Sequence, residues 1–270
     1  MDIRFTKMNG AGNDFVVLDN RSGGFSLDGS AIAKLCDRHR GVGADGLLSV
    51  EASSSRADFR MRYYNSDGGE AEMCGNGARC FARFAARLMP QMPASLSFET
   101  QVGVISATFE SDLVTLDMGY PQDHKTPQSL ELGGAQCRVH FINTGVPHAV
   151  VFVSDIEAVD VQSLGSELRW HEAFAPKGTN ANFVQVLPSG SLTVRTYERG
   201  VEGETLACGT GVCASALLHA LETGAISPIL VQVRGGDTMR VDFEKTLQGA
   251  LDGVRLTGPA EFVFEGVVSL

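Results

Sequence analysis

The sequence predicts a mixed fold of the α+β (α/β) class, built from two pseudo-symmetric halves. Segments with alternating or β-rich composition dominate the chain, and many of its 31 glycines lie between them. Helical spacing of apolar residues is rarer. Two of the helix-like segments begin with nearly the same motif, because residues 73–80 read MCGNGARC and residues 207–213 read ACGTGVC. Strands, a cysteine-headed helix and further strands therefore occur twice, which indicates an internal duplication.

The first half opens with strands and one short helix. In residues 28–39, Ile32 and Leu35 recur at helical spacing, and Ser26 or Asp28 is a candidate N-cap. The strands expected in this half are residues 3–8, 15–19, 47–51, 59–65, 96–100, 104–109 and 113–118.

The two cysteine-headed helices are expected at residues 75–88 and 209–222. Pro90 stops the first, and Gly224 is a candidate C-cap for the second. Both segments are rich in alanine and apolar on nearly all sides, so each is expected to be buried inside strands.

The crossing between the halves is expected at residues 120–132. This stretch contains Pro121 and Pro127 and few apolar residues, which is typical of a connection rather than a core element. The strands expected after it are residues 138–143, 148–153, 183–187, 192–198, 229–234, 239–243 and 262–268.

Composition excludes several classes of protein. The chain has 270 residues, 43% of them hydrophobic and 20% charged, as in ordinary soluble globular proteins. A net charge of −10 argues against nucleic-acid binding. There is no apolar run long enough to span a membrane, and no secretory signal is visible. Six cysteines in a chain of this length do not form a disulfide scaffold, so a reducing cytoplasm is the expected setting. The six cysteines show no metal-ligand spacing, and no metal is expected.

Cys74 and Cys208 are the candidate chemical groups. A cysteine at a helix N-terminus lies at the positive end of the helix dipole, which favours the reactive thiolate. Two such cysteines in matched settings suggest an acid–base pair that acts on opposite faces of one carbon. One thiolate would remove an α-proton and the other thiol would return one, which inverts the centre without a cofactor. The other cysteines are interpreted as inert: Cys36, Cys80, Cys137 and Cys213.

Other polar residues fit a substrate with a carboxylate. The first turn of each helix has unpaired N–H groups that suit an anion. Asn65 ends a strand shortly before Cys74, and Asn180 and Asn182 lie in the motif GTNANF. Glu198 and Arg199 precede Cys208, where the arginine could hold a carboxylate and the glutamate an ammonium.

These residues together resemble the diaminopimelate epimerase family. The resemblance covers nearly the whole chain, through KMNGAGNDFVVLD near the start, GVGADGLL at 41–48 and YYNSDGGEAEMCGNGARCFARF at 63–84. It continues with GVPHAVVFV at 145–153, GTNANFVQV at 178–186 and YERGVEGETLACGTGVCASA at 197–216.

The resemblance implies a specific architecture. Each half would be a curved, barrel-like, mostly antiparallel sheet wrapped around a central helix, with the active site in the cleft between the halves. The last strand would return to the first half. The expected division is residues 1–118 plus 256–270 and residues 119–255. The family also implies a homodimer, no cofactor, and a diamino dicarboxylic acid as the small-molecule substrate.

The implied reaction interconverts LL- and meso-2,6-diaminopimelate in lysine and peptidoglycan precursor biosynthesis. Cys74 and Cys208 would be the two catalytic bases, with His148 near the reacting centre. Backbone N–H groups of Gly75, Asn76, Gly209 and Thr210 would bind the α-carboxylate, and Asn13, Asn65, Asn180, Glu198 and Arg199 would contact the substrate.

Three positions depart from the usual family pattern. Asn9 stands where histidine is usual, Gly46 where many members have a substrate-contacting glutamine, and Val146 where asparagine is usual. Asn143 and Thr144 are candidates to compensate for the amide lost at position 146.

Other functions compete with this interpretation. A proline or hydroxyproline racemase on the same fold usually has a histidine after the first Cys-Gly and an aspartate-led approach to the second cysteine. Asn76 and the pair Glu198 and Arg199 occupy those places here. A phenazine-type isomerase would lack the cysteine pair. From another class, the chain could be a thiol redox sensor or an amino-acid-binding module.

Overall fold

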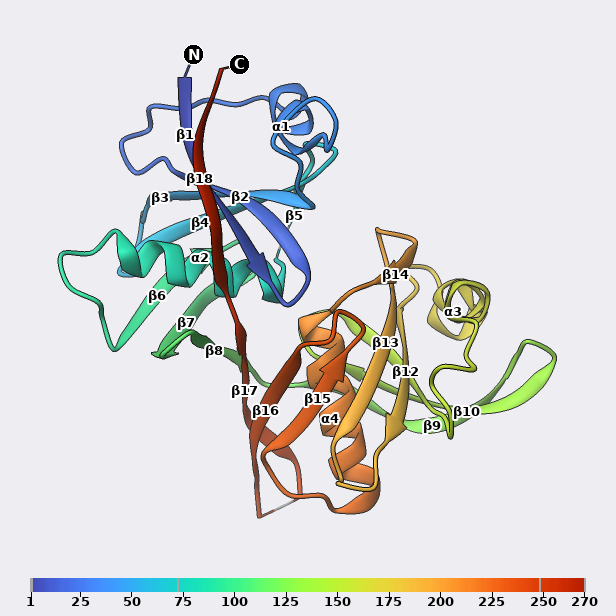
Figure 1. The fold of residues 1–270 in the computed structure, drawn as a ribbon. Coiled ribbons are helices and arrows are strands. Elements are labelled where there is room, and N and C mark those ends of the chain that lie inside the picture. Colours follow the sequence, from blue (N-terminus) through green and yellow to red (C-terminus); the bar gives the residue numbers. More distant parts are fainter. Residues whose placement is uncertain (1, 72, 248, 270) are drawn as a thin grey trace. The chain divides into compact units, whose positions relative to one another are not determined.

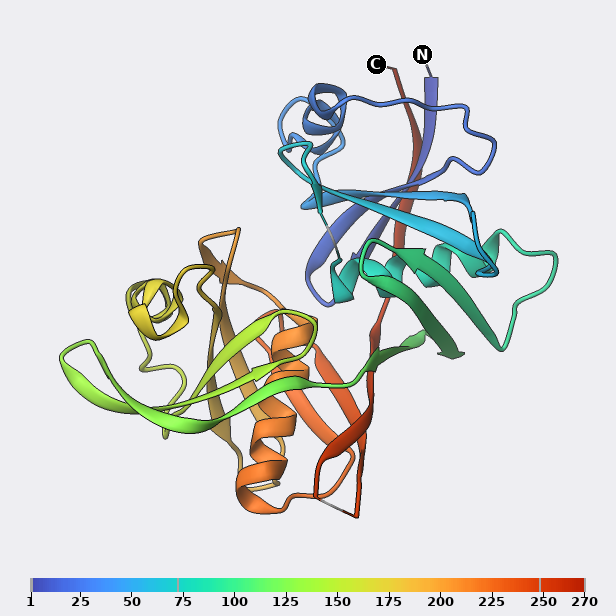
Figure 2. The ribbon, with the colours of Figure 1, turned by 180° about the vertical axis from the view of Figure 1, so that it is seen from behind.

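The computed structural model describes residues 2–71, 73–247 and 249–269. The chain divides into two compact units (Figures 1 and 2). Unit 1 comprises Met1–Asp117 and Gly258–Leu270, and unit 2 comprises Met118–Thr257. Both units combine many strands with few helices in the same order. The predicted α+β fold with two repeated halves is therefore confirmed.

Unit 1 is one sheet in which the last strand of the chain lies beside the first (Figure 1). The strand order is β18–β1–β2–β3–β4–β6–β7–β8, and the short β5 pairs with β4 on the same edge as β6. The pairs β2–β3 and β4–β6 are parallel, and the others are antiparallel. The strands are β1 (Asp2–Gly10), β2 (Asn13–Asp19), β3 (Gly46–Ala52), β4 (Phe59–Asn65), β5 (Glu70–Ala71), β6 (Ser95–Thr100), β7 (Gly103–Glu110), β8 (Leu113–Gly119) and β18 (Glu261–Ser269).

Unit 2 repeats this topology pair by pair. The order is β9–β10–β11–β12–β13–β15–β16–β17, with β14 beside β15 on the edge of β13. Again, two pairs are parallel, β11–β12 and β13–β15. The strands are β9 (Gln122–Leu132), β10 (Ala135–Asn143), β11 (Pro147–Phe152), β12 (Asn180–Val186), β13 (Leu192–Glu198), β14 (Gly203–Thr205), β15 (Ile229–Val233), β16 (Thr238–Lys245) and β17 (Leu251–Pro259).

One buried helix lies at the centre of each sheet. Helix α2 (Gly75–Arg87) contacts β1, β2, β3, β4, β6 and β7, and α4 (Gly209–Thr223) contacts the corresponding strands β10, β11, β12, β13, β15 and β16 (Figure 2). Because strands surround them, both helices are buried over most of their length, as their alanine-rich sequences predicted. Gly224 ends α4 in the left-handed conformation (φ 76°), which confirms it as the C-cap.

The register places equivalent residues of the two units in equivalent positions. Phe15 pairs with Gly46 in unit 1 as His148 pairs with Asn180 in unit 2. One step further along the same face, Leu48 pairs with Tyr63, and Asn182 pairs with Thr196. The duplication therefore extends from the order of the strands to single residues.

The predicted crossing at residues 120–132 is wrong. Residues 122–132 form β9, an edge strand that pairs with β10. The prediction failed because β9 is exposed along most of its length and so lacks the apolar alternation of a half-buried strand. Pro127 is compatible with such a strand, because an edge strand has N–H groups that need no partner in the sheet.

The smaller helices also differ from expectation. Helix α1 (Gly29–Cys36) is capped by Asp28 as predicted, but it ends before residue 39 because Asp37 is extended and its carboxylate accepts from His39 N–H. Sequence analysis missed α3 (Val161–Trp170), the short 3₁₀ helix η1 (Glu172–Phe174) and strands β5, β14 and β17.

Candidate functional site

Cys74 is the N-cap of α2. Its backbone is extended (φ −137°, ψ 120°), and its Sγ accepts a hydrogen bond from Gly77 N–H at 3.5 Å. A helix N-terminus combines unpaired N–H donors with a partial positive charge. This position therefore stabilises a thiolate at Cys74, and Gly75 and Asn76 occupy the first turn behind it.

The side chain of Asn76 is fixed between Arg79 and Asn13. Arg79 Nη2 donates to Asn76 Oδ1 at 2.9 Å, so the amide nitrogen faces the other way and donates to Asn13 Oδ1 at 2.5 Å. Asn13 Nδ2 in turn donates to Asp45 Oδ2 at 3.0 Å. Because arginine can only donate, it sets the orientation of both amides.

A cluster of charges lies behind this chain of amides. Asp14 pairs with Lys7 at 2.7 Å and with Arg38 at 2.8 Å, and Arg38 also pairs with Asp45 at 2.7 Å. Burial raises the pKa of Asp14, but hydrogen bonds from Arg38 and Lys7 outweigh it and hold the pKa well below its usual range. The cluster therefore gives Asn13 a fixed, charged support.

Cys208 is the N-cap of α4 in unit 2, with the same extended backbone (φ −126°, ψ 107°). Its Sγ lies 3.5 Å from Thr210 Oγ1, which lies 2.9 Å from His148 Nε2. His148 Nδ1 is 3.1 Å from Asn182 Nδ2. A continuous chain of polar contacts therefore connects β12, β11 and the first turn of α4, where Gly209 is the first residue.

His148 is completely buried and uncharged at neutral pH. Burial lowers the pKa of this imidazole to about 3, and the positive charge of Arg199 lowers it as well, against the opposing hydrogen bond with Asn182. The predicted supporting residue is therefore placed beside Thr210, in the neutral form.

Asn180 holds the segment that carries Arg199. Its Oδ1 accepts from Arg199 N–H at 2.8 Å, and its Nδ2 donates to Pro147 O at 3.1 Å. Glu198 is the last residue of β13, as Asn65 is the last residue of β4 in unit 1. The structure thus groups Cys74, Asn76 and Asn13 in unit 1, and Cys208, Thr210, His148, Asn180 and Arg199 in unit 2.

The unusual residues at positions 9, 46 and 146 have local explanations. Asn9 Oδ1 accepts from Gly12 N–H at 3.0 Å and closes the turn between β1 and β2. A Cβ at Gly46 would lie 2.5 Å from Tyr64 O, so this strand has no room for a side chain there. Near Val146, the hydroxyl of Thr144 donates to Thr210 O at 2.8 Å and thereby reaches the first turn of α4.

The other cysteines have settings that suit packing. Burial raises the pKa of Cys36 to about 11 and that of Cys80 to about 12, so both remain thiols at neutral pH. Cys213 is buried inside α4, and Cys137 is half-buried in β10. Cys74 and Cys208 differ from these four cysteines because each of them is the N-cap of a helix.

Two polar residues in these contacts had no predicted role: Asn182 was noted only as part of its motif, and Arg79 was not singled out. Both are buried side chains with several hydrogen bonds. A signal for Asn182 was present, since it lies two residues after Asn180 in a strand and so faces the same side of the sheet.

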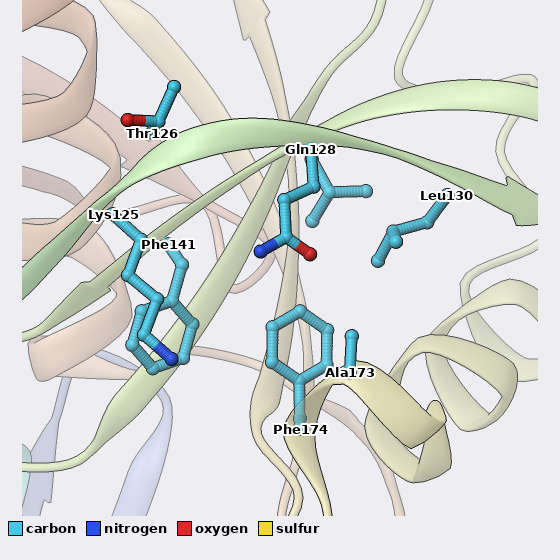
Figure 3. A pocket seen from close by; sticks show the side chains of 8 residues that line it. Lys125, Thr126, Gln128, Leu130, Phe141, Ala173 and Phe174 are labelled. Atoms are coloured by element: carbon cyan, nitrogen blue, oxygen red, sulfur yellow. The ribbon is translucent and has the colours of Figure 1, made fainter.

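Other features of the described chain bear on metal binding, membrane crossing and one small cavity. Within residues 2–71, 73–247 and 249–269, no three His, Cys, Asp or Glu residues are grouped to hold a metal, and no helix is long and apolar enough to cross a membrane. Figure 3 shows an aromatic cavity between Phe141 and Phe174, with Lys125 at its side. Its volume of about 10 Å³ leaves room for a water molecule at most, not for a substrate.

Comparisons of the chain with a family model and with curated proteins agree on one family. A family model described as diaminopimelate epimerase matches residues 5–123 and 140–263. The diaminopimelate epimerase of Chlorobaculum tepidum is 40% identical and covers 97% of this chain and 100% of its own. That of Aquifex aeolicus is 42% identical and covers 99% of this chain and 98% of its own.

Solved structures show the same fold at low sequence identity. A phenazine biosynthesis protein of the PhzF family from Bacillus anthracis is 16% identical, with a TM-score of 0.75 over 100% of both chains. A probable proline racemase from Agrobacterium radiobacter K84 is 15% identical, with a TM-score of 0.74 over 99% of this chain and 93% of its own. At such identities, the likeness concerns the fold alone.

Proposed function

Because the chain belongs to the diaminopimelate epimerase family and has its isomerase function in lysine biosynthesis, we propose that Cys74 and Cys208 are its two proton-transfer groups. The observation that carries this proposal is that each cysteine is the N-cap of the central helix of its unit. Each thiol therefore lies at the positive end of a helix dipole, which favours the thiolate, so either cysteine can serve as the base.

The proposed reaction inverts one α-carbon of 2,6-diaminopimelate. One thiolate takes the α-proton as the C–H bond breaks, and the electron pair remains on the α-carbon. The other thiol then gives its proton to the opposite face. LL-diaminopimelate becomes the meso isomer, the two sulfurs exchange protonation states, and proton return balances the reaction without a redox step.

The reacting carboxylate is proposed to bind at the two helix N-termini. Backbone N–H groups of Gly75 and Asn76 would bind it from one side, and those of Gly209 and Thr210 from the other. Such fixed donors stabilise developing negative charge by about 3–4 kcal/mol each. They thereby offset the weak acidity of the α-proton.

The remaining predicted residues are proposed to recognise the rest of the diamino diacid. Arg199 suits a carboxylate and Glu198 an ammonium group. Asn13, Asn65 and Asn180 offer amides, although the hydrogen bonds of Asn13 to Asp45 and of Asn180 to Pro147 and Arg199 N–H already use part of their capacity. Asn13 and Asn180 are therefore held in fixed orientations, and Asn65 lies at the end of β4.

Solvent deuterium tests the two-thiol proposal. In heavy water, the wild-type chain should place one deuterium on the inverted α-carbon of diaminopimelate. Cys74→Ala and Cys208→Ala should each lower epimerisation at least about 1,000-fold, because each removes one of two required proton carriers. Cys137→Ala, outside the proposed site, is the control and should remain active.

The outcome is measured by mass spectrometry of separated isomers. Product without deuterium, or a fully active Cys74→Ala variant, would exclude proton exchange through the two thiols. Proline and hydroxyproline should not be racemised, since the proposed contacts require a second amino acid centre. The chemistry needs reduced thiols, so we place the protein in the cytoplasm.

A homodimer is the proposed assembly, and β18 is its candidate surface. Phe262, Val263, Phe264 and Val267 of this strand are 37–58% exposed in the single chain. Adjacent apolar side chains on an exposed strand are a common feature of protein interfaces. Sedimentation should report twice the chain mass, and Val263→Asp should shift the chain toward monomer. A monomeric wild-type chain would contradict the proposal.

A further inference from the structure

We propose that Asn182 is a positioning residue that fixes the direction of a hydrogen-bond chain ending on Cys208. The chain runs from Asn182 to His148, to the hydroxyl of Thr210, and then to Sγ of Cys208. The inference rests on the proposed role of Cys208 in proton transfer, and it adds a residue that does not itself contact the reacting atoms.

The orientation of the Asn182 amide follows from a backbone carbonyl. Ala149 O lies 3.0 Å from Asn182 Nδ2 and can only accept, so the NH₂ group must be on this side. The same nitrogen is 3.1 Å from His148 Nδ1. On the other side, Asn182 Oδ1 accepts from the hydroxyl of Thr196 at 3.0 Å. Every polar contact of this buried amide agrees with one orientation.

This orientation selects one tautomer of His148. Because Nδ1 accepts from Asn182, the single ring proton of the neutral imidazole must lie on Nε2. Nε2–H then donates to Thr210 Oγ1 at 2.9 Å. The hydroxyl proton of Thr210 is left to donate to the Cys208 sulfur 3.5 Å away. A donated hydrogen bond stabilises the thiolate more than the thiol.

The surroundings maintain this direction. His148 and Asn182 are fully buried, and Thr196 is almost so, which excludes water that could reverse a contact. The charged group that acts on His148 is Arg199, whose positive charge opposes a second ring proton. Gly211, in the first turn of α4, permits the close approach, since a Cβ there would lie 2.4 Å from Asn182 Oδ1.

At the corresponding register positions of unit 1, two of the three residues are apolar and cannot repeat this chain. Phe15, Leu48 and Tyr63 stand where unit 2 has His148, Asn182 and Thr196. Gly77 packs against Phe15 and Leu48 as Gly211 packs against His148 and Asn182. Cys74 instead accepts from Gly77 N–H. The duplicated halves therefore support their two thiols by different means.

The test measures the ionisation of each thiol in the same molecule. The full chain is treated with iodoacetamide across a pH series, and peptide mass spectrometry reports the alkylation rate of Cys74 and Cys208 separately. In Asn182→Leu, which copies Leu48 of unit 1, the midpoint for Cys208 should rise by about one pH unit. The midpoint for Cys74 should not move and serves as the internal control.

Two variants of His148 separate hydrogen-bond direction from simple packing. His148→Gln can still accept from Asn182 and donate to Thr210, so its Cys208 midpoint should stay within about 0.3 pH units of wild type. His148→Phe, which copies Phe15, should raise the midpoint as Asn182→Leu does. This pair tests the proposal even if Asn182→Leu does not fold.

A Cys208 midpoint that is unchanged in both Asn182→Leu and His148→Phe would overturn the proposal. An equal shift of both thiols would overturn it too, because the chain reaches only Cys208. Alkylation is measured without substrate, so these results stand apart from the deuterium experiment. Failure of the two-thiol reaction and failure of the Asn182 chain are thus distinguishable.

Discussion

At the scale of single residues, the close approach of two strands decides what position 46 can hold. Gly46 begins β3 opposite Asn65, and an added Cβ would lie 2.5 Å from Tyr64 O and 2.8 Å from Tyr63 Cε2. A glutamine at this position, as the family resemblance led us to expect, could not be placed without moving the backbone of β4. The substrate contact expected from such a glutamine must therefore be absent or supplied from another position.

Gly46→Ala tests this packing. It should lower the free energy of unfolding by about 1–3 kcal/mol, because the nearest atom is a backbone oxygen that cannot rotate away. Urea denaturation measures the change. Gly203→Ala in β14 is the matched control: its Cβ would lie 3.8 Å from a side-chain atom, and the expected change is within about 0.5 kcal/mol. Equal effects at both glycines would contradict the steric explanation.

The two candidate cysteines could be predicted from the sequence, but the contacts that support Cys208 could not. Cys74 and Cys208 could be selected from the motif because their position at a helix N-terminus follows from local sequence. The role of Asn182 could not, since it depends on the parallel register that places β12 beside His148. Sequence spacing shows which side of a strand a residue faces, but not which partner strand lies beside it.

At the scale of elements, α2 is tied to its sheet by a buried arginine. Arg79 has no exposed surface, and it donates to Gly75 O at 3.4 Å, to Asn76 Oδ1 at 2.9 Å and to Pro259 O at 3.1 Å. It therefore joins the first turn of α2 to Pro259 of unit 1, two residues before β18 begins. Backbone carbonyls that lose such a donor in the interior have no water to replace it.

Arg79→Met should therefore destabilise the chain by about 3 kcal/mol or more, as measured by chemical denaturation. Arg138→Met provides the comparison, because the Arg138 side chain is 65% exposed and pairs with Glu222 at the surface. Its expected cost is below about 1 kcal/mol. Equal losses in the free energy of unfolding for the two substitutions would show that Arg79 does not hold α2 in place.

Whether a helix or strand could be predicted from the sequence depends on how much apolar surface it buries. Central strands and the buried helices were predicted because their apolar residues face a core. Strand β9 was missed because it is polar and exposed, and α3 because Gly165 and Arg169 are among its few buried residues, which leaves a weak apolar pattern. Elements with little buried apolar surface leave little periodicity to detect.

At the scale of the whole molecule, the buried His148 makes stability depend on pH. In the unfolded chain this histidine takes a proton below about pH 6.5. In the folded chain burial, assisted by Arg199, keeps its pKa at about 3. Between these values the unfolded state binds more protons, so the free energy of unfolding falls as the pH falls.

His148→Gln should remove this part of the pH dependence. Between pH 7 and pH 5, the wild-type chain should lose about 2 kcal/mol more stability than the variant. Urea denaturation at several pH values measures the difference. If the free energy of unfolding changed with pH in the same way for wild type and His148→Gln, the pKa of His148 would be the same in the folded and unfolded states.

The position of β18 has a consequence for how the chain is made. Asp2 of β1 pairs with Ser269 of β18, so β1 is synthesised long before its partner strand. At about 5–20 residues per second, the delay is roughly 15–50 s on the ribosome. Unit 2 is continuous from Met118 to Thr257 and can complete its own sheet in that time. The β1 edge of nascent unit 1 must remain unpaired until β18 has been synthesised, and a chaperone that binds exposed strand edges would act there.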